Sequence, residues 1–243
     1  MKIWGKTDIG KLRQINQDNF YTEIINQDIA ILCVCDGMGG QKAGHIASKY
    51  ALNEFIFIMK QGIKDNMSDL DIKELLEEAV LKANKFVYEM AVCEASLSDM
   101  GTTLIGGLVY NRSFYVSNTG DSRCYHIASD KITQVTKDHS FVQQLIDTGK
   151  ITISESYDHP KRNVITKAIG IYQRIKSDIY KIKLEDGEYI LLCSDGLYNH
   201  VNDDSIKHKI LVDEPIDRKC EKLIDIANLN GGYDNITAVV LQF

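Results

Sequence analysis

Four short segments rich in β-branched and aromatic residues follow one another between residues 102 and 136. They are Thr102–Tyr110, Phe114–Thr119, Arg123–Ala128 and Lys131–Thr136. The breaks between them are Asn111-Arg112-Ser113, Gly120-Asp121-Ser122 and Ser129-Asp130. Strand patterns separated by such short polar breaks are typical of hairpins. The spacing therefore predicts a hairpin meander and an antiparallel sheet.

Further strand patterns lie on both sides of this region. The continuous apolar run Ile29–Cys35 ends at Asp36-Gly37, as a buried strand does. Ser177–Leu184 and Tyr189–Cys193 flank a polar four-residue break, which predicts a second hairpin. Asn235–Phe243 is predicted as a last strand.

Amphipathic segments predict helices between the strands. They cover Ala43–Lys60, Asp69–Ala95, His139–Thr148, Asp203–Leu211 and Pro215–Leu229. Strands and helices cluster without regular alternation, which favours antiparallel sheets covered by helices over a doubly wound parallel sheet. The 243 residues contain only two prolines and no linker-like tract, so we expect one domain over residues 1–243.

Composition excludes several classes of protein. The net charge of −6 argues against a nucleic-acid-binding protein. The longest apolar run is far shorter than the roughly 18 residues that cross a bilayer, and the N-terminus lacks the apolar stretch of a signal peptide. We therefore expect a cytoplasmic protein without membrane contact. The six cysteines include no Cys-x-x-Cys pair and are predicted as buried thiols, with a thiolate metal site at Cys33 and Cys35 disfavoured.

Five aspartates stand at the ends of predicted strands or beside glycine and small polar residues. They are Asp18, Asp36, Asp121, Asp195 and Asp234. Mg²⁺ and Mn²⁺ prefer oxygen ligands, and neighbouring glycines allow a backbone carbonyl to join them. Clustered carboxylates repel one another, and two divalent cations cancel that charge and can activate a water for attack on phosphorus.

Each of these features also has a plainer interpretation. An Asp-Gly pair after a strand is most often a simple turn, so only the co-occurrence of several suggests a metal site. Arg13 suits a phosphate dianion, although a single surface arginine is usually just solvated. Gly37–Gly40 lacks the lysine of a nucleotide-binding loop. Among the six histidines, His139 and His159 are considered as possible substrate contacts.

Taken in order, the motifs resemble those of the metal-dependent protein phosphatases, the PPM or protein phosphatase 2C-like family, in its compact bacterial form. The similarity extends over essentially the whole chain. The N-terminal motifs are Thr7-Asp8-Ile9-Gly10, Arg13-x-x-Asn16-Gln17-Asp18, Asp36-Gly37-Met38-Gly39-Gly40, Gly101-Thr102-Thr103 and Gly120-Asp121-Ser122-Arg123. The later ones are Thr136-Lys137-Asp138-His139-Ser140, His159-Pro160-x-x-Asn163, Ser194-Asp195-Gly196-Leu197 and Asp234-Asn235-Ile236-Thr237.

This resemblance implies an α+β fold: a sandwich of two antiparallel β-sheets flanked on both faces by α-helices, in four layers α-β-β-α. It implies hydrolysis of phosphoserine and phosphothreonine in proteins with two Mn²⁺ or Mg²⁺ ions. By the same resemblance, Asp36 bridges both metals, Gly37 ligates one through its carbonyl, and Asp195 and Asp234 complete the other site.

Three more roles follow from the resemblance. Asp18 matches a position near the metals, where it can act through water. Asp121 matches the site of a third, weaker metal, and Arg13 holds the phosphate. Residues from about 136 to 169 would form a flap beside the active site.

Two departures from the animal enzymes stand out. Met38 replaces the histidine proposed there as general acid, and Gln17 replaces a glutamate, so that the second metal is expected to be held more loosely.

We expect a monomer that acts on phosphoproteins and opposes a bacterial Ser/Thr kinase. Two alternatives are a phosphoprotein-binding pseudophosphatase, which would have lost metal aspartates, and a phosphatase of small phosphate esters.

Overall fold

Eleven strands form two antiparallel sheets in the computed structural model, which describes the backbone of all 243 residues and every side chain except those of residues 40–42. The first sheet has the order β1 (Lys2–Asp8), β11 (Ile236–Gln242), β10 (Tyr189–Cys193), β7 (Arg123–Ile127) and β8 (Ile132–Gln134). The second has the order β2 (Asp18–Ile24), β3 (Ile29–Met38), β5 (Leu104–Tyr110), β6 (Ser113–Thr119) and β9 (Asp178–Lys183), and the short β4 (Gly101–Thr102) pairs with β3.

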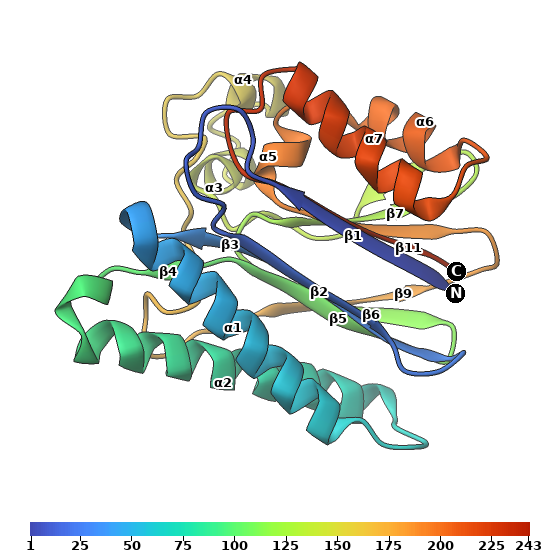
Figure 1. Cartoon of the computed structure of the whole chain (residues 1–243), viewed down its shortest axis with the longest axis horizontal. Coiled ribbons are helices and arrows are strands. Elements are labelled where there is room, and N and C mark those ends of the chain that lie inside the picture. The colour runs from blue at the N-terminus through green and yellow to red at the C-terminus, as the bar shows by residue number, and fades with distance from the viewer.

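Helices cover the outer face of each sheet (Figure 1). The antiparallel pair α1 (Gly40–Gly62) and α2 (Asp69–Cys93) lies on the second sheet, while α5 (Asp195–Tyr198), α6 (Asp203–Leu211) and α7 (Ile216–Leu229) lie on the first. The 3₁₀ turn η1 (Ala95–Leu97) follows α2. The predicted fold class, a four-layer α-β-β-α sandwich, is confirmed.

The central strand β3 shows why its sequence is continuously apolar. Ile31 and Cys33 face the cluster formed with α1 and α2, whereas Leu32 and Val34 face the other sheet. Both faces of the strand are therefore buried, so every position takes an apolar residue. A third apolar cluster lies between the first sheet and α6 and α7.

The predicted meander is wrong at one turn. β5 pairs with β6 and β7 pairs with β8, as expected for hairpins, but Gly120–Ser122 carries the chain from the second sheet to the first. The predicted hairpin around 185–188 is also wrong, since it joins β9 of the second sheet to β10 of the first. A short polar turn looks the same in a hairpin and in a crossing between stacked sheets, and only packing of the flanking strands separates the two.

Several elements were not predicted. β1 and β2 are half-exposed and carry many polar side chains, which hides their strand pattern. The short helix α4 (Ile153–Tyr157) was not predicted either, whereas α3 (Phe141–Asp147) lies within the predicted helix His139–Thr148. Neither helix contains a buried residue among those described. Within the described part of the chain, no helix is both apolar and long enough to cross a membrane.

Five of the six cysteines are buried, as predicted, and Cys93 at the end of α2 is exposed. The exposure of Cys93 corrects the prediction of buried thiols, since it lies where the helix leaves the core. Cys33 and Cys35 share a face of β3, with their sulfur atoms 3.9 Å apart.

Candidate active site

A cavity of about 200 Å³ opens where strand ends from both sheets meet. Its lining contains Arg13, Gln17, Asp36, Gly37, Met38, Asp121, Asn163, Ile165, Asp195, Asp234 and Asn235. Every predicted site residue except Asp18 is therefore brought to one place, although the residues come from positions 13 to 234 of the sequence. Asn163, Ile165 and Asn235 also line it, although no role is predicted for them from the sequence.

Each acidic side chain is placed by the end of a strand. Asp36 lies near the end of β3, and Asp195 is the first residue of α5, two positions after β10 ends. Asp234 precedes β11, and Asp121 lies in the crossing from β6 to β7. Because the two sheets stack, these strand ends converge at one edge of the sandwich.

Asp18 lies behind the cavity, opposite Asp36 in the pairing of β2 with β3. Its Oδ2 atom accepts hydrogen bonds from Ser194 Oγ at 2.7 Å and Thr237 Oγ1 at 2.6 Å. Ser194 follows β10 and Thr237 lies in β11, both of the first sheet, whereas Asp18 begins β2 of the second. Asp18 therefore joins the two sheets at the site. Its Oδ1 atom is buried without a hydrogen-bond partner.

The carboxyl groups make one another hard to ionise. Burial, with smaller contributions from neighbouring aspartates, raises the pKa of Asp18 to about 6 and that of Asp121 to about 7. Burial and the adjacent carboxylates raise the pKa values of Asp36 and Asp195 well above the ordinary range. A site that must ionise four such groups at neutral pH needs compensating positive charge.

The residues present fit divalent cations. The acidic side chains in the cavity offer only oxygen atoms, the ligands that Mg²⁺ and Mn²⁺ prefer. Two carboxylate oxygens, Asp18 Oδ1 and Asp121 Oδ1, are buried and unpartnered, which is costly unless a cation or an ordered water meets them. Gly37 has to be glycine, because a Cβ there would lie 2.1 Å from the Gly44 carbonyl oxygen of α1.

The acidic side chains are close but do not converge on one point. Among the described residues, no three His, Cys, Asp or Glu side chains are arranged to hold a metal ion as they stand. Asp234 shows the reason, because its Oδ2 accepts from Arg13 at 2.7 Å and its Oδ1 from the Asn235 backbone N–H at 2.8 Å. Both of its oxygens are thus engaged within the protein.

Hydroxyl groups fix the backbone around Asp36. The Asp36 N–H donates to Thr103 Oγ1 at 2.9 Å, and Thr103 Oγ1 lies 2.8 Å from Ser122 Oγ. Thr102 Oγ1 donates to the Asp36 carbonyl at 2.9 Å. This buried chain of hydroxyls links the end of β3 to the turn that carries Asp121. Thr102, Thr103 and Ser122 stand in the quoted motifs, but the sequence did not indicate this role.

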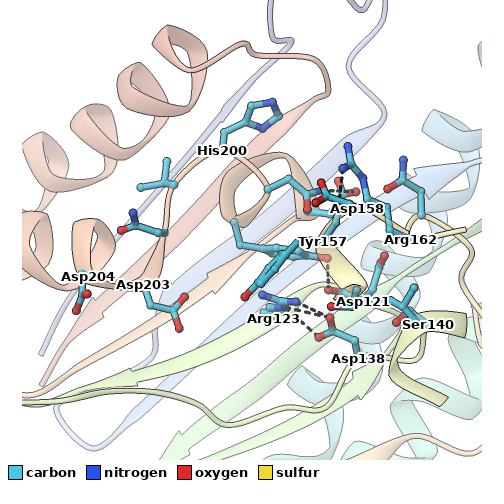
Figure 2. Close-up of a pocket in the computed structure, with 18 residues that line it drawn as sticks. Asp121, Arg123, Asp138, Ser140, Tyr157, Asp158, Arg162, His200, Asp203 and Asp204 are labelled. Atoms are coloured by element: carbon cyan, nitrogen blue, oxygen red, sulfur yellow. Dashed lines mark hydrogen bonds and ion pairs between the residues drawn. The ribbon is translucent and has the colours of Figure 1, made fainter. Parts of the chain in front are cut away.

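A partly buried ion pair supports the same turn from the other side. Arg123 Nη2 donates a hydrogen bond to Asp138 Oδ2 at 2.7 Å, and Arg123 Nε donates to both oxygens of the same carboxylate. Its guanidinium stacks 3.6 Å from the Tyr198 ring centroid, and the Tyr198 hydroxyl donates to the Asp121 carbonyl at 3.1 Å. Figure 2 shows Arg123, Asp138 and Asp121 side by side.

A second, larger cavity of about 760 Å³ adjoins the first and shares Asp121, Asn163 and Asp195 with it. Its walls are the segment 140–163 on one side and the segment 195–204 on the other. Figure 2 shows residues of both walls of this groove, with Tyr157 and Arg162 from the first segment and Asp203 from the second.

His139 and His159 were considered as substrate contacts. His139 instead packs inward, with Nδ1 accepting the Gly120 backbone N–H at 3.0 Å and with 12% of its side chain exposed. His159 Nδ1 accepts the Lys161 backbone N–H at 3.1 Å, within the same segment.

Comparison with known proteins identifies the family of the chain. The profile of the protein phosphatase 2C family matches residues 11–224. A putative protein phosphatase 2C-type protein of Streptococcus pyogenes serotype M6 is 35% identical over 244 residues, covering 100% of this chain and 97% of that protein.

Two solved structures add detail. The serine/threonine phosphatase Stp1 from Staphylococcus aureus has a TM-score of 0.92 and 34% identity, covering 100% of this chain and 94% of that one. The catalytic domain of the serine threonine protein phosphatase PstP in complex with 2 manganese ions has a TM-score of 0.84 and 31% identity, covering 98% and 96% of the two chains. The chain therefore belongs to the protein phosphatase 2C family, the metal-dependent protein phosphatases.

Proposed function

We propose that Asp36, Gly37, Asp195 and Asp234 hold two divalent cations beside Arg13, and that this centre carries out the chain's reaction as a metal-dependent protein serine/threonine phosphatase. The observation that carries the assignment is that these residues line one cavity, where burial and neighbouring carboxylates raise the pKa values of Asp36 and Asp195. The relatives named serine/threonine phosphatases agree with this chemistry.

The protein's own residues supply binding and orientation. Bound Mn²⁺ or Mg²⁺ ions would activate water and polarise the phosphoryl group. Arg13 would turn from Asp234 to the phosphate, since a guanidinium binds a phosphate dianion through two parallel hydrogen bonds. Asp36 is held by the hydroxyls of Thr102 and Thr103, so the ligand cradle is built before substrate arrives.

Three further positions complete the assignment. Asp18 would act from behind the cavity, through water or through its contact with the ligand shell. Asp121 would belong to a third, weaker cation site. Met38 lines the cavity where the animal enzymes carry histidine, and its thioether holds no proton, so this position does not protonate the leaving group.

The larger groove favours a protein substrate over a small phosphate ester. A phosphoryl group fills only the small cavity, whereas the adjoining space of about 760 Å³ suits a stretch of polypeptide. The residues from about 136 to 169 would then act as a flap over that stretch, within one domain of residues 1–243.

The setting of the enzyme follows the same reasoning. We expect a monomer in the cytoplasm whose partners are phosphoproteins and a Ser/Thr kinase that phosphorylates them. No observation favours a phosphoprotein-binding pseudophosphatase, because each aspartate proposed as a ligand is present at the site.

The test is hydrolysis of a phosphothreonine peptide by the purified chain with Mn²⁺, with Mg²⁺ and with excess EDTA, beside Asp36→Asn as the matched inactive variant. We expect phosphate release that needs metal and the Asp36 carboxylate. Release that persists in EDTA, or in the variant, would overturn the two-cation assignment. Faster hydrolysis of sugar phosphates than of the peptide would favour the small-ester alternative.

A further inference from the structure

His139 makes two reciprocal backbone contacts with Gly120, the residue before Asp121. Its Nδ1 accepts the Gly120 N–H at 3.0 Å, and its own backbone N–H donates to the Gly120 carbonyl at 2.9 Å. We infer that His139 is a positioning residue of the phosphatase reaction, which holds the turn carrying Asp121 in the geometry needed to bind metal. The inference rests on the proposed function of Asp121 as a ligand.

The hydrogen bonds assign the tautomer of His139. Because a backbone N–H points at Nδ1, this atom carries no proton and the neutral ring is protonated at Nε2. Nε2 lies 3.2 Å from Asp178 Oδ2, which accepts that proton's hydrogen bond. Lys167 Nζ lies 3.0 Å from Nε2 but cannot donate to a protonated nitrogen, so in this tautomer it donates to Asp178 Oδ1, 3.3 Å away.

The surroundings keep the ring neutral. Burial lowers the pKa of His139, and the nearby Lys167 charge lowers it further, against the opposing effects of Asp178 and Asp138. A protonated ring would present an N–H to the Gly120 N–H, and the contact would be lost. The neutral form is therefore the one that can hold Gly120.

The backbone of Gly120 depends on contacts with other residues to hold its conformation, because glycine has no side chain to restrict its φ and ψ angles. Its φ angle of 115° lies in the region that favours glycine, and a Cβ there would lie 2.6 Å from Thr103 Cβ. The turn therefore has to contain glycine, which is also the residue with the most backbone freedom. His139 removes that freedom by engaging both the N–H and the C=O of this one residue.

The constraint passes directly to Asp121. Its carbonyl is held by the Tyr198 hydroxyl, while its side-chain Oδ1 is buried without a partner. Nothing in the described hydrogen bonding of that oxygen fixes its direction, so the backbone on either side sets it. Residues behind metal ligands typically change metal affinity or activity by about 10- to 100-fold when they are replaced.

Two substitutions separate this role from simple packing. In His139→Asn the amide oxygen can take the place of Nδ1 and still accept from Gly120. In His139→Gln the amide reaches the place of Nε2, which keeps the contact with Asp178 and loses the one with Gly120. His159→Ala is the matched control, because it also removes a histidine that accepts a backbone N–H from the segment 136–169.

The first measurement is amide hydrogen exchange of residues 118–123 in the metal-free chain. We expect faster exchange in His139→Gln and little change in His139→Asn and His159→Ala. The second is the Mn²⁺ concentration that gives half-maximal hydrolysis of p-nitrophenyl phosphate. We expect it to rise about 10- to 100-fold in His139→Gln, with KM for the ester changed less than threefold, and to recover in His139→Asn.

The outcomes are distinguishable. Equal exchange at Gly120 in His139→Gln and wild type overturns the inference, as does a Mn²⁺ requirement that rises equally in His139→Asn and His139→Gln. If the variants differ in exchange as expected but wild-type protein hydrolyses no ester, the proposed function is contradicted while the contact between His139 and Gly120 stands. Thermal melting of each variant identifies any that fails to fold, and the conservative asparagine keeps the test decisive in that case.

Discussion

Arg13 Nη2 lies 2.7 Å from Asp234 Oδ2, so the residue proposed to bind phosphate is paired with a residue proposed to bind metal. Both side chains are partly exposed, and such a pair contributes little to stability. The arginine can therefore change partners at small cost when a phosphoryl group arrives, while cations take over Asp234.

Arg13→Ala is expected to raise KM for a phosphopeptide about tenfold with a smaller change in kcat, because it removes binding shared by the ground state and the transition state. Arg13→Lys should have a KM between those of wild type and Arg13→Ala, since an ammonium group keeps the charge but cannot form the paired hydrogen bonds. Steady-state kinetics at saturating Mn²⁺ measures both constants. An unchanged KM in Arg13→Ala would assign Arg13 to pairing with Asp234 alone.

Asp36→Asn should reduce kcat by about three orders of magnitude or more, because removal of one group that stabilises developing charge costs about 10²–10³ and this group is also proposed to hold the cations. The same variant should melt at a higher temperature than wild type in EDTA, since burial and neighbouring aspartates disfavour the charged carboxylate. Asp186→Asn, at an exposed ion pair with Arg112, is the control. Lower stability of Asp36→Asn in EDTA would contradict this account of the site's electrostatics.

The metal-free protein should lose stability as pH rises from about 4 to about 7. Folding raises the pKa of Asp18 to about 6 and that of Asp121 to about 7, so the folded chain binds these protons more tightly than the unfolded chain. The free energy of unfolding therefore falls through this window and levels off above it.

Melting curves in EDTA at pH 5 and pH 8 measure this difference, which we expect to be roughly 5–10 °C from these groups. Added Mn²⁺ should raise the melting temperature more at pH 8, where protons no longer compete for the carboxylates. The Asp121→Asn variant should show a shallower pH dependence. A melting temperature that rises between pH 5 and pH 7 in EDTA, with the variant unaltered, would refute the prediction.

Thr103→Val should destabilise the fold by about 1–3 kcal/mol, because it leaves the buried Asp36 N–H without an acceptor. Valine keeps the shape of threonine, so packing changes little. Thr103→Ser retains the hydroxyl and is the control, expected to bind Mn²⁺ nearly as wild type does. Urea denaturation and Mn²⁺ calorimetry test the pair, and equal behaviour of the two variants would show that the methyl group matters more than the hydrogen bond.

The sequence predicted which residues line the small cavity better than it predicted the connections between strands. Asp36 and Asp195 follow apolar runs that end at strand termini, and this local pattern survives in the structure. Their meeting point depended on stacking of two sheets, which the resemblance implied and the residue pattern alone did not.

The crossings between sheets were not predictable from local sequence. Gly120–Ser122 has the composition of a hairpin turn, and only the pairing of β6 with β9 and of β7 with β10 shows that it is not one. The contact between His139 and Gly120 was missed for a similar reason, since Gly120 is 19 residues away and offers only backbone atoms.

The crossing at Gly120–Ser122 has a consequence for assembly of the enzyme. Asp36 belongs to the second sheet, while Asp195 and Asp234 adjoin strands of the first. Neither sheet carries all of the proposed ligands, so bound cations would link the two sheets to each other. Metal binding would therefore require that the two sheets have already packed together. A partly folded chain with only one sheet formed would bind no metal pair and would have no activity.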